Sequence, residues 1–284
     1  MKNLSPLADN CCYNYFSDIM QAKRKPEVKS ALLVLAPDIQ NRYQDYIQNK
    51  MDLSVVNSVV YNQTDKSALL NCYESTTKPL AALKTKILEA QNPTLRGKCQ
   101  YCGINAPTTF DHYMPKDTFP EYSVMPINLI PCCFECNNIR NDNWLTSSNH
   151  RGTINLYYEN LPTDRYLSTI VVYSDDVPVA NFNIFNPGTI NSTLFTIVLS
   201  HFEILKLKNR YKVQTASVAS EIKRSIVAHN HPPISGHDIS QWLIEEANSK
   251  RQEFGENYWE AAFIEGLATC DDFINQCIIE INNK

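Results

Sequence analysis

The sequence is poor in glycine and lacks any long apolar run. Seven glycines occur among 284 residues, and the long stretches without glycine favour helix. The most apolar run, residues 194–199, is far too short to cross a bilayer. No apolar segment follows the first residues, so we expect no signal peptide, no membrane association and a cytoplasmic location.

An excess of positive charge is also missing. The formal net charge is −4 and the isoelectric point is about 5.9, so any contact with nucleic acid must come from a local basic patch. The hydrophobic fraction of 43% and the charged fraction of 20% are typical of a globular protein. A chain of 284 residues is long enough for one large domain or two modest ones.

Cysteine is abundant, in a pattern that disulfide bonds explain poorly. Five of the ten cysteines fall within residues 99–136. A secreted scaffold would spread its cysteines more evenly over a shorter chain. Clustered pairs in a chain without a signal peptide point instead to a metal site.

Two Cys-x-x-Cys pairs lie in this stretch, Cys99 with Cys102 and Cys133 with Cys136. A spacer of two residues lets both thiolates face one ion, and two such knuckles complete a tetrahedral zinc site. Cys132 offers a different spacing to Cys136, but the match to the first pair favours Cys133, which leaves Cys132 as a small apolar core residue. The alternative is a set of free buried cysteines without metal.

The residues around the two cysteine pairs lead to two further expectations. Gly97 and Gly103 flank the first pair, where a positive backbone φ favours glycine. Residues 96–145 are dense in proline, glycine, cysteine and asparagine, and helical periodicity is lost there. We therefore expect a loop-rich unit that zinc binding holds together, so that the free energy of metal binding contributes to folding.

The flanks of this unit are predicted to be mostly helical. Residues 38–50 form a helix that Pro37 precedes, and a helical pattern over residues 65–91 is divided by Pro79. Residues 166–173 and 177–185 predict a β-hairpin with a turn at residues 174–176. The remaining helices are expected at residues 191–228, with Asn191 or Ser192 as N-cap, and at 237–253 and 256–282.

The fold class is therefore α+β and mostly helical, in four regions. They are an N-terminal helical region (1–95), the unit with the cysteine pairs (96–145), a β-hairpin region (146–190) and a C-terminal helical region (191–284).

Between and after the cysteine pairs lie residues suited to hydrolytic metal chemistry. Asp111 offers a hard oxygen ligand for Mg²⁺ or Mn²⁺, and the neutral imidazole of His112 can accept a proton from water. Adjacent residues on a strand face opposite sides, so bringing both to one site requires a strand end or a distorted backbone. Asn137 and Asn141 lie four residues apart on one helical face, and either could give an oxygen to a metal. An Asp-His pair by itself is more often structural than catalytic.

The whole series resembles the HNH endonuclease motif and covers about 45 of the 284 residues. The matching positions are Cys99, Cys102, Asp111, His112, Pro115, Asn128, Leu129, Pro131, Cys133, Cys136, Asn137 and Arg140. The resemblance implies that residues 96–145 are an HNH nuclease unit, a ββα element around a catalytic metal with two zinc knuckles, between helical flanks and a β-hairpin.

The resemblance also implies a role for each matching polar residue. His112 corresponds to the general base and Asp111 to a ligand of the catalytic divalent ion. Asn128 corresponds to the catalytic-site asparagine that braces the loop and orients the histidine. Asn137 stands where many members have a second histidine, and would be the second ligand of the divalent ion. This departure leaves the metal less certain, although an amide oxygen prefers Mg²⁺ or Mn²⁺.

Two basic residues are candidates for substrate contact. Arg140 corresponds to a basic position near the phosphate, and Lys116 follows the Asp-His pair closely. The implied reaction is phosphodiester hydrolysis without a covalent intermediate, with a divalent ion at the phosphate and leaving 3′ oxygen and His112 deprotonating water. We expect the rate to fall at low pH, as His112 becomes protonated.

DNA is the favoured substrate and RNA the alternative. A chain with an HNH unit between helical flanks looks like effectors of bacterial anti-phage defence, in which a regulatory protein subunit such as an ATPase is a candidate partner. The second hypothesis is a zinc-stabilised interaction module or an inactive HNH domain. An assay of His112→Ala separates the two.

Two other features of the sequence lie outside this unit. His229, His231 and His237 could bind metal, but no carboxylate or cysteine lies at ligand spacing, which favours a solvated turn. The segment 201–230 is the most basic long helix, and it either follows a nucleic-acid backbone or is a solvated face. Its cations are Lys206, Lys208, Arg210, Lys212, Lys223 and Arg224.

Overall fold

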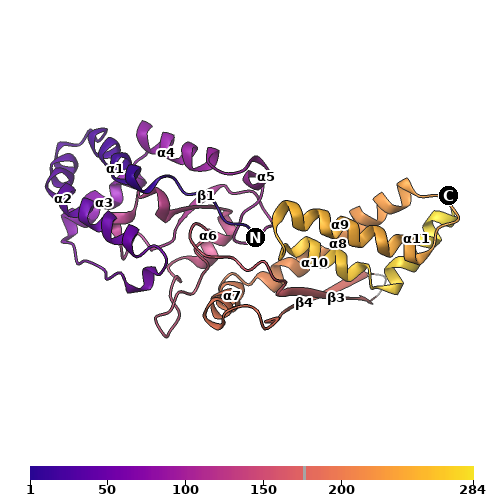
Figure 1. Cartoon of the computed structure of the whole chain (residues 1–284). Coiled ribbons are helices and arrows are strands. Elements are labelled where there is room, and N and C mark those ends of the chain that lie inside the picture. Colours follow the sequence, from indigo (N-terminus) through magenta and orange to yellow (C-terminus); the bar gives the residue numbers. More distant parts are fainter. Residues whose placement is uncertain (175–176) are drawn as a thin grey trace. The chain divides into compact units, whose positions relative to one another are not determined.

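The computed structural model describes residues 1–174 and 177–284 and divides into two compact units (Figure 1). One unit is Asn3–Asn160, and the other joins Met1–Lys2 to Leu161–Lys284. The architecture is mostly helical α+β, with two separate two-stranded sheets, which confirms the predicted fold class. Among the described residues, no helix combines the length and apolarity that a membrane span requires.

The first unit begins with helices that surround its core. They are α1 (Cys12–Gln21), α2 (Pro26–Gln48), α3 (Gln63–Glu74), α4 (Lys78–Glu89) and the short α5 (Pro93–Arg96). The side chains of Asn62, Thr77 and Asn92 cap α3, α4 and α5 by accepting backbone N–H bonds. Pro79 lies in the first turn of α4, where its missing N–H breaks no bond, which confirms that it separates two helices.

One predicted helix start is wrong. Pro37 lies inside α2 rather than before a helix, and residues 38–48 are only the second half of that element. An interior proline removes one backbone hydrogen bond and crowds the preceding turn. The helix continues because Leu32 and Leu35 before it and Ile39 after it are all buried on one side, so packing outweighs the local cost.

The second half of this unit contains a ββα element. Strand β1 (Thr109–His112) pairs antiparallel with β2 (Leu129–Cys132), and helix α6 (Phe134–Arg140) follows β2. Two short 3₁₀ turns, η3 (Pro120–Tyr122) and η4 (Pro126–Asn128), lie in the connection between the strands. Every residue from 119 to 133 is buried, so this irregular segment is itself part of the core.

The second unit is a β-hairpin packed on helices. Strands β3 (Leu167–Ser174) and β4 (Val177–Ile184) pair antiparallel from Leu167 opposite Ile184 to Ser174 opposite Val177, which confirms the predicted hairpin. Residues 175 and 176 of the predicted turn lie outside the described residues. The helices are α7 (Ser192–Ile204), α8 (Leu207–His229), α9 (Gly236–Phe254), α10 (Trp259–Leu267) and α11 (Asp271–Asn282). Helix α8 packs against β4 and α10 against β3 (Figure 1).

Two long helices predicted for this unit are each divided in the structure. The segment 191–228 breaks at Lys206, whose φ of 53° is left-handed, and Asn191 is its N-cap. The segment 256–282 breaks between α10 and α11. Apolar periodicity continues across both breaks without proline, so the sequence pattern alone carries no stop signal there.

Candidate active site and metal centre

Four cysteines meet in one buried cluster. The Sγ atoms of Cys99, Cys102, Cys133 and Cys136 all lie within 4.8 Å of one another. The Sγ atoms of Cys102 and Cys133 are 3.8 Å apart. Four zinc–sulfur bonds of about 2.3 Å in a tetrahedron place the sulfurs about 3.8 Å apart, so the donors and their spacing fit a structural zinc ion. Within the described residues, this is the one group of histidine, cysteine or acidic side chains close enough to hold a metal.

The first knuckle is shaped by a tight backbone turn. The carbonyl of Cys99 accepts hydrogen bonds from the N–H groups of Cys102 at 3.2 Å and Gly103 at 2.6 Å. Gly103 has a φ of 70°, which confirms the need for glycine there. Gly97, in contrast, has a φ of −81°, so the predicted positive φ is wrong at that position. Gly97 ends α5 in right-handed helical geometry, which any residue can adopt.

The second knuckle begins helix α6. Cys133 is the N-cap, and its Sγ accepts from the N–H of Cys136 at 3.5 Å. The neighbouring thiols, Cys102 first, hold the pKa of the Cys133 thiol well below its usual value. Cys132 points elsewhere, with its Sγ 3.5 Å from Thr109 Oγ1, and burial raises the pKa of its thiol. The four-cysteine cluster contains Cys133 and not Cys132, as the spacing predicts.

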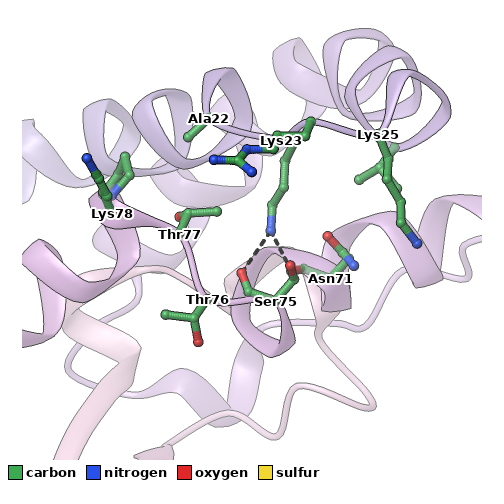
Figure 2. Close-up of a pocket in the computed structure, with 11 residues that line it drawn as sticks. Ala22, Lys23, Lys25, Asn71, Ser75, Thr76, Thr77 and Lys78 are labelled. Atoms are coloured by element: carbon green, nitrogen blue, oxygen red, sulfur yellow. Dashed lines mark hydrogen bonds between the residues drawn. The ribbon is translucent and has the colours of Figure 1, made fainter.

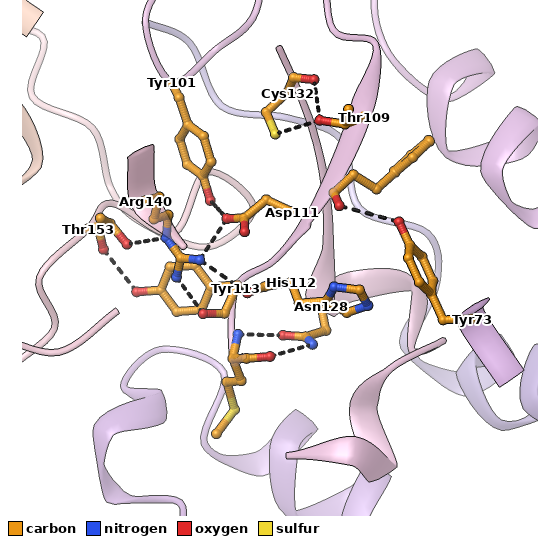
Figure 3. A network of polar contacts seen from close by, with 12 residues as sticks. Tyr73, Tyr101, Thr109, Asp111, His112, Tyr113, Asn128, Cys132, Arg140 and Thr153 are labelled. Atoms are coloured by element: carbon orange, nitrogen blue, oxygen red, sulfur yellow. Dashed lines mark hydrogen bonds and ion pairs between the residues drawn. The ribbon is translucent and has the colours of Figure 1, made fainter. Parts of the chain in front are cut away.

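A hollow of about 190 Å³ lies where β1 ends and α6 ends. Five of the residues singled out from the sequence line it, namely Asp111, His112, Lys116, Asn137 and Asn141. The other lining residues are Tyr73, Phe110, Pro115, Asp117 and Asp142. Asp111 and His112 are the last two residues of β1, and both border the hollow. Their side chains leave the strand in different directions, Asp111 toward Tyr101 and Arg140 and His112 toward Tyr73 (Figure 3). The residues that the sequence suggested for the site therefore border one hollow.

Asp111 is held from inside the protein (Figure 3). It is 3% exposed, and its Oδ2 accepts a hydrogen bond from the Tyr101 hydroxyl at 2.9 Å. The same oxygen lies 2.7 Å from Nη1 of Arg140. Burial raises the pKa of the Asp111 carboxyl, although Arg140 and Tyr101 act in the opposite direction. These contacts fix the orientation of the carboxylate at the hollow.

The imidazole of His112 is neutral and held in one orientation. Its Nε2 lies 2.8 Å from the Ser123 carbonyl, which can only accept, so Nε2 carries the hydrogen and Nδ1 keeps its lone pair. Burial lowers the pKa of His112 to about 4, partly opposed by the Ser123 carbonyl, so the imidazole is neutral at neutral pH. The ring centroid is 4.4 Å from that of Tyr73, and the planes are inclined by 73°.

Asn128 does not line the hollow but ties together the loop beneath it. It is fully buried, and its Oδ1 accepts from the Met114 N–H at 2.8 Å. Its Nδ2 donates to the carbonyls of Met114 at 3.1 Å and Tyr122 at 3.2 Å, and Tyr46 donates to its Oδ1 at 3.3 Å. The side chain of Asn128 thus joins the segment after His112 to the end of η3.

Arg140 lies inside the protein, while Lys116 lies at the hollow. Arg140 is 0% exposed, and its guanidinium donates to the carbonyls of His112 at 3.1 Å and Tyr113, and to Thr153 Oγ1 at 3.2 Å. The structure therefore places this cation under Asp111 rather than at a surface open to a phosphate. Lys116 pairs with Glu74 at 3.1 Å on the rim.

The residues that sequence reasoning missed come from distant or featureless positions. Tyr73 lies on α3, and its hydroxyl donates to the Phe110 carbonyl at 3.3 Å. Nothing in its local sequence marks it. Lys84 on α4 lies 4.0 Å above the Tyr73 ring. Asp117 and Asp142 are loop carboxylates close in sequence to motif positions, and that proximity was the available signal.

The other candidates do not form a site. His229, His231 and His237 are exposed, and they belong to no group that could hold a metal among the described residues. Arg210 of the basic segment is buried, and Lys223 pairs with Glu280 at 2.7 Å. The cations of the segment 201–230 therefore do not share one exposed face.

Comparison with known proteins agrees with this geometry. Residues 99–143 match the family model described as HNH endonuclease. The chain is also 28% identical over 197 residues to Protein ea31 of Escherichia phage lambda, an alignment that covers 62% of this chain and 63% of that protein. The chain thus spans less than two thirds of the length of this relative. No solved structure matches. Residues 99–143 are therefore an HNH endonuclease domain, with the four-cysteine cluster typical of zinc-binding members.

Proposed function

We propose that this chain is a metal-dependent endonuclease that hydrolyses phosphodiester bonds in DNA. The observation that carries the proposal is the 190 Å³ hollow in which Asp111, His112 and Asn137 meet beside the cysteine cluster. A carboxylate, a neutral imidazole and an amide at one accessible hollow are the groups that metal-assisted hydrolysis requires.

The donor set of the hollow fits a hard divalent cation. Asp111 and Asn137 offer carboxylate and amide oxygens, and Asn141, Asp117 and Asp142 add further oxygens on the rim. Such oxygens suit Mg²⁺ or Mn²⁺, whereas the four thiols suit zinc. When bound at Asp111 and Asn137, the cation supplies positive charge for the scissile phosphate and the leaving oxygen.

The protein's own groups divide the remaining work. His112 Nδ1 accepts the proton of the attacking water, while the Ser123 carbonyl keeps the ring oriented through Nε2. Arg140 positions Asp111 from below, and Asn128 positions the loop that follows His112. Lys116 is the cation at the rim and is proposed to contact the phosphate.

A cleavage assay tests this proposal. Plasmid, linear DNA and RNA are incubated with the purified chain and Mg²⁺, Mn²⁺ or no divalent ion. We expect DNA cleavage that needs the ion and is lost in His112→Ala, with the zinc content unchanged. His150→Ala, which removes an exposed histidine of the same unit, is the matched control and keeps full activity. Absence of cleavage of any substrate with every ion would refute the proposal, and cleavage of RNA alone would change its substrate.

A zinc-held interaction module is the second candidate function. One observation favours it, since Oδ2 of Asp111 is already engaged by Tyr101 and Arg140 in a buried network. In that case His112→Ala would change no biological outcome, whereas loss of zinc would still unfold the unit.

We further propose a biological role as an effector of bacterial anti-phage defence, with a regulatory protein subunit such as an ATPase. The support is the arrangement of an HNH domain with large helical regions around it. A bacterial host that expresses the chain and its genomic neighbours should plate phage less efficiently, and His112→Ala should abolish this protection. Equal plating with and without the wild-type chain would contradict the role.

A further inference from the structure

A second and larger hollow lies in the first unit, apart from the site described above. It has a volume of about 790 Å³ and is bordered by the turn between α1 and α2 and by the linker between α3 and α4 (Figure 2). Its lining residues are Ala22, Lys23, Arg24, Lys25, Val28, Asn71, Ser75, Thr76, Thr77, Lys78 and Pro79. No known role is assigned to these residues by the HNH match, which begins at residue 99.

The charge of this hollow is of one sign. Lys23, Arg24, Lys25 and Lys78 all line it, and no carboxylate of the described residues 1–174 and 177–284 does. Within the part of the chain that the structure describes, none of these four cations has an acidic partner within 4.0 Å. In a chain of net charge −4, four unpaired cations at one concave surface create a local positive potential that attracts an anion.

Lys23 gives the hollow a buried charge. Its residue is 7% exposed, and its Nζ donates to the carbonyls of Asn71 at 2.6 Å and Ser75 at 3.3 Å, as Figure 2 shows. An ammonium has three N–H donors, so these bonds leave one. Neutral carbonyls at the end of α3 offset the charge only in part. An anion in the hollow would supply the missing countercharge.

Side chains rather than backbone amides would recognise the anion. Helix α4 begins at the hollow, but Pro79 has no N–H, and the Leu80 N–H is already bonded to Thr77 Oγ1 at 3.3 Å. The N-terminus of α4 therefore has little to offer. Besides the cations, Ser75 and Thr76 bring exposed hydroxyl groups to the hollow, and hydroxyls bond readily to phosphate oxygens.

Residues on or directly after α3 line both hollows. Tyr73 lines the cleavage hollow, while Asn71 and Ser75, each two residues away, line the basic one. Residues two positions apart on a helix point to different sides of it, so the two hollows are separated by about the width of a helix, roughly 10–12 Å. Glu74, between them, pairs with Lys116 of the cleavage hollow. A nucleic-acid strand that passes around the C-terminal end of α3 can therefore reach both hollows, which lie a few nucleotides apart along it.

We propose that the basic hollow binds a backbone phosphate of the nucleic acid that the HNH domain cuts, a few nucleotides from the scissile bond. This inference rests on the proposed function and adds the surface that holds the substrate. It accounts for nucleic-acid binding by an acidic protein whose motif arginine, Arg140, is buried. Because phosphate contacts carry no sequence information, this surface contributes affinity and register rather than specificity.

The test is a binding measurement on the full chain in a His112→Ala background. Fluorescence anisotropy gives the affinity for a labelled DNA duplex over a series of salt concentrations. Lys25→Glu with Lys78→Glu reverses two exposed charges of the hollow, and Lys208→Glu with Lys212→Glu makes the same change on the exposed part of α8. We expect Lys25→Glu with Lys78→Glu to weaken DNA binding roughly 10- to 100-fold. The slope of the logarithm of the binding constant against the logarithm of the salt concentration should fall in magnitude by about two, as for two lost phosphate contacts. The α8 pair should keep the wild-type slope.

Other outcomes overturn the inference. If Lys25→Glu with Lys78→Glu keeps the wild-type affinity and salt dependence, the hollow does not bind the DNA. If this variant and the α8 variant weaken binding equally, the effect is one of overall charge. Inorganic phosphate is the second probe. If phosphate displaces DNA no more than chloride does at equal ionic strength, the hollow binds a phosphate of the nucleic-acid backbone. If phosphate displaces DNA saturably, and Lys25→Glu with Lys78→Glu abolishes this effect, the hollow is a site for free phosphate instead.

Cleavage kinetics separate this inference from the proposed function. In the active chain, Lys25→Glu with Lys78→Glu should raise KM roughly 10-fold or more and leave kcat within about twofold, since uniform binding is removed. An unchanged KM in an active enzyme would refute the basic hollow alone. A wild-type chain that binds DNA through the hollow but never cuts would refute the nuclease alone.

Discussion

Replacing Arg140 by methionine tests the internal role of this residue. Methionine fills a similar volume but removes the ion pair to Asp111 at 2.7 Å and the bonds to the His112 and Tyr113 carbonyls and to Thr153. Arg140 is 0% and Asp111 3% exposed, so the carboxylate would remain buried without its partner. Breaking one side of such a pair costs about 3–5 kcal/mol of unfolding free energy.

Hydrogen exchange of the β1 and β2 amides, read peptide by peptide, measures this loss in the full chain. Lys116→Met is the matched control, because Lys116 forms only rim pairs with Glu74 and Asp117. Surface pairs of this kind contribute about 0–1 kcal/mol, so the control should change the exchange little. Adding Asp111→Asn to Arg140→Met should restore part of the protection, since no charge then remains buried.

A different outcome would return Arg140 to the role that the sequence suggested. Suppose that Arg140→Met changes the opening free energy from hydrogen exchange by less than about 1 kcal/mol but raises KM for DNA. The guanidinium would then contact the phosphate of the substrate. The internal network around Asp111 would then be a wrong description of the site.

Three further predictions concern pH, zinc and the first knuckle. The pKa of His112 is about 4 in the folded chain and 6.5 in the unfolded chain, so between these pH values the unfolded chain binds more protons. The unfolding free energy of the first unit should therefore fall by on the order of 3 kcal/mol as the pH falls from about 6.5 to about 4, and His112→Asn should lack this component in a pH series. Removing zinc with a chelator should abolish hydrogen-exchange protection of residues 99–143, because structural zinc supplies about 10–16 kcal/mol in small zinc units, and persistent protection would argue against a structural zinc. Gly103→Ala should cost about 1–2 kcal/mol because its φ is 70°, whereas Gly97→Ala at φ −81° should cost less than about 0.5 kcal/mol, and equal effects in denaturant titrations would contradict the turn geometry.

The cysteine cluster could be predicted because its signal is local, whereas the ββα order was implied by the resemblance to the HNH motif. A two-residue spacer sets the direction of two thiols, and the same spacing at Cys99 and Cys133 indicates one shared ion. The choice between Cys132 and Cys133 followed from that spacing and agrees with the cluster. The hairpin was similarly visible, because alternation over residues 167–184 reflects pairing of neighbouring strands.

Features that depend on packing were not visible in the sequence. The burial of Arg140 follows from its contacts with Thr153 and with Asp111, which lies 29 positions earlier. Tyr73 reaches His112 only because α3 packs beside the ββα element. Pro37 inside α2 and the break at Lys206 both show tertiary contacts prevailing over local preference.

The basic hollow illustrates the same limit. Three of its four cations are consecutive in the sequence, Lys23, Arg24 and Lys25, whereas Lys78 lies 55 positions after Lys23. They line one hollow because Lys23 bonds to the C-terminal end of α3, which lies directly before the start of α4. The fold therefore adds a distant cation and a concave surface to a short basic run that is visible in the sequence.

The convergence of Asp111, His112 and Asn137 on one divalent cation is tested most directly by anomalous diffraction. Crystals of the zinc-loaded chain are soaked in Mn²⁺, and data are collected at the zinc and manganese edges. We predict a zinc peak among Cys99, Cys102, Cys133 and Cys136 and a separate manganese peak within about 2.0–2.6 Å of Asp111 and Asn137 oxygens, beside His112. Manganese located away from the hollow, or a cysteine cluster without zinc, would contradict the proposed active site.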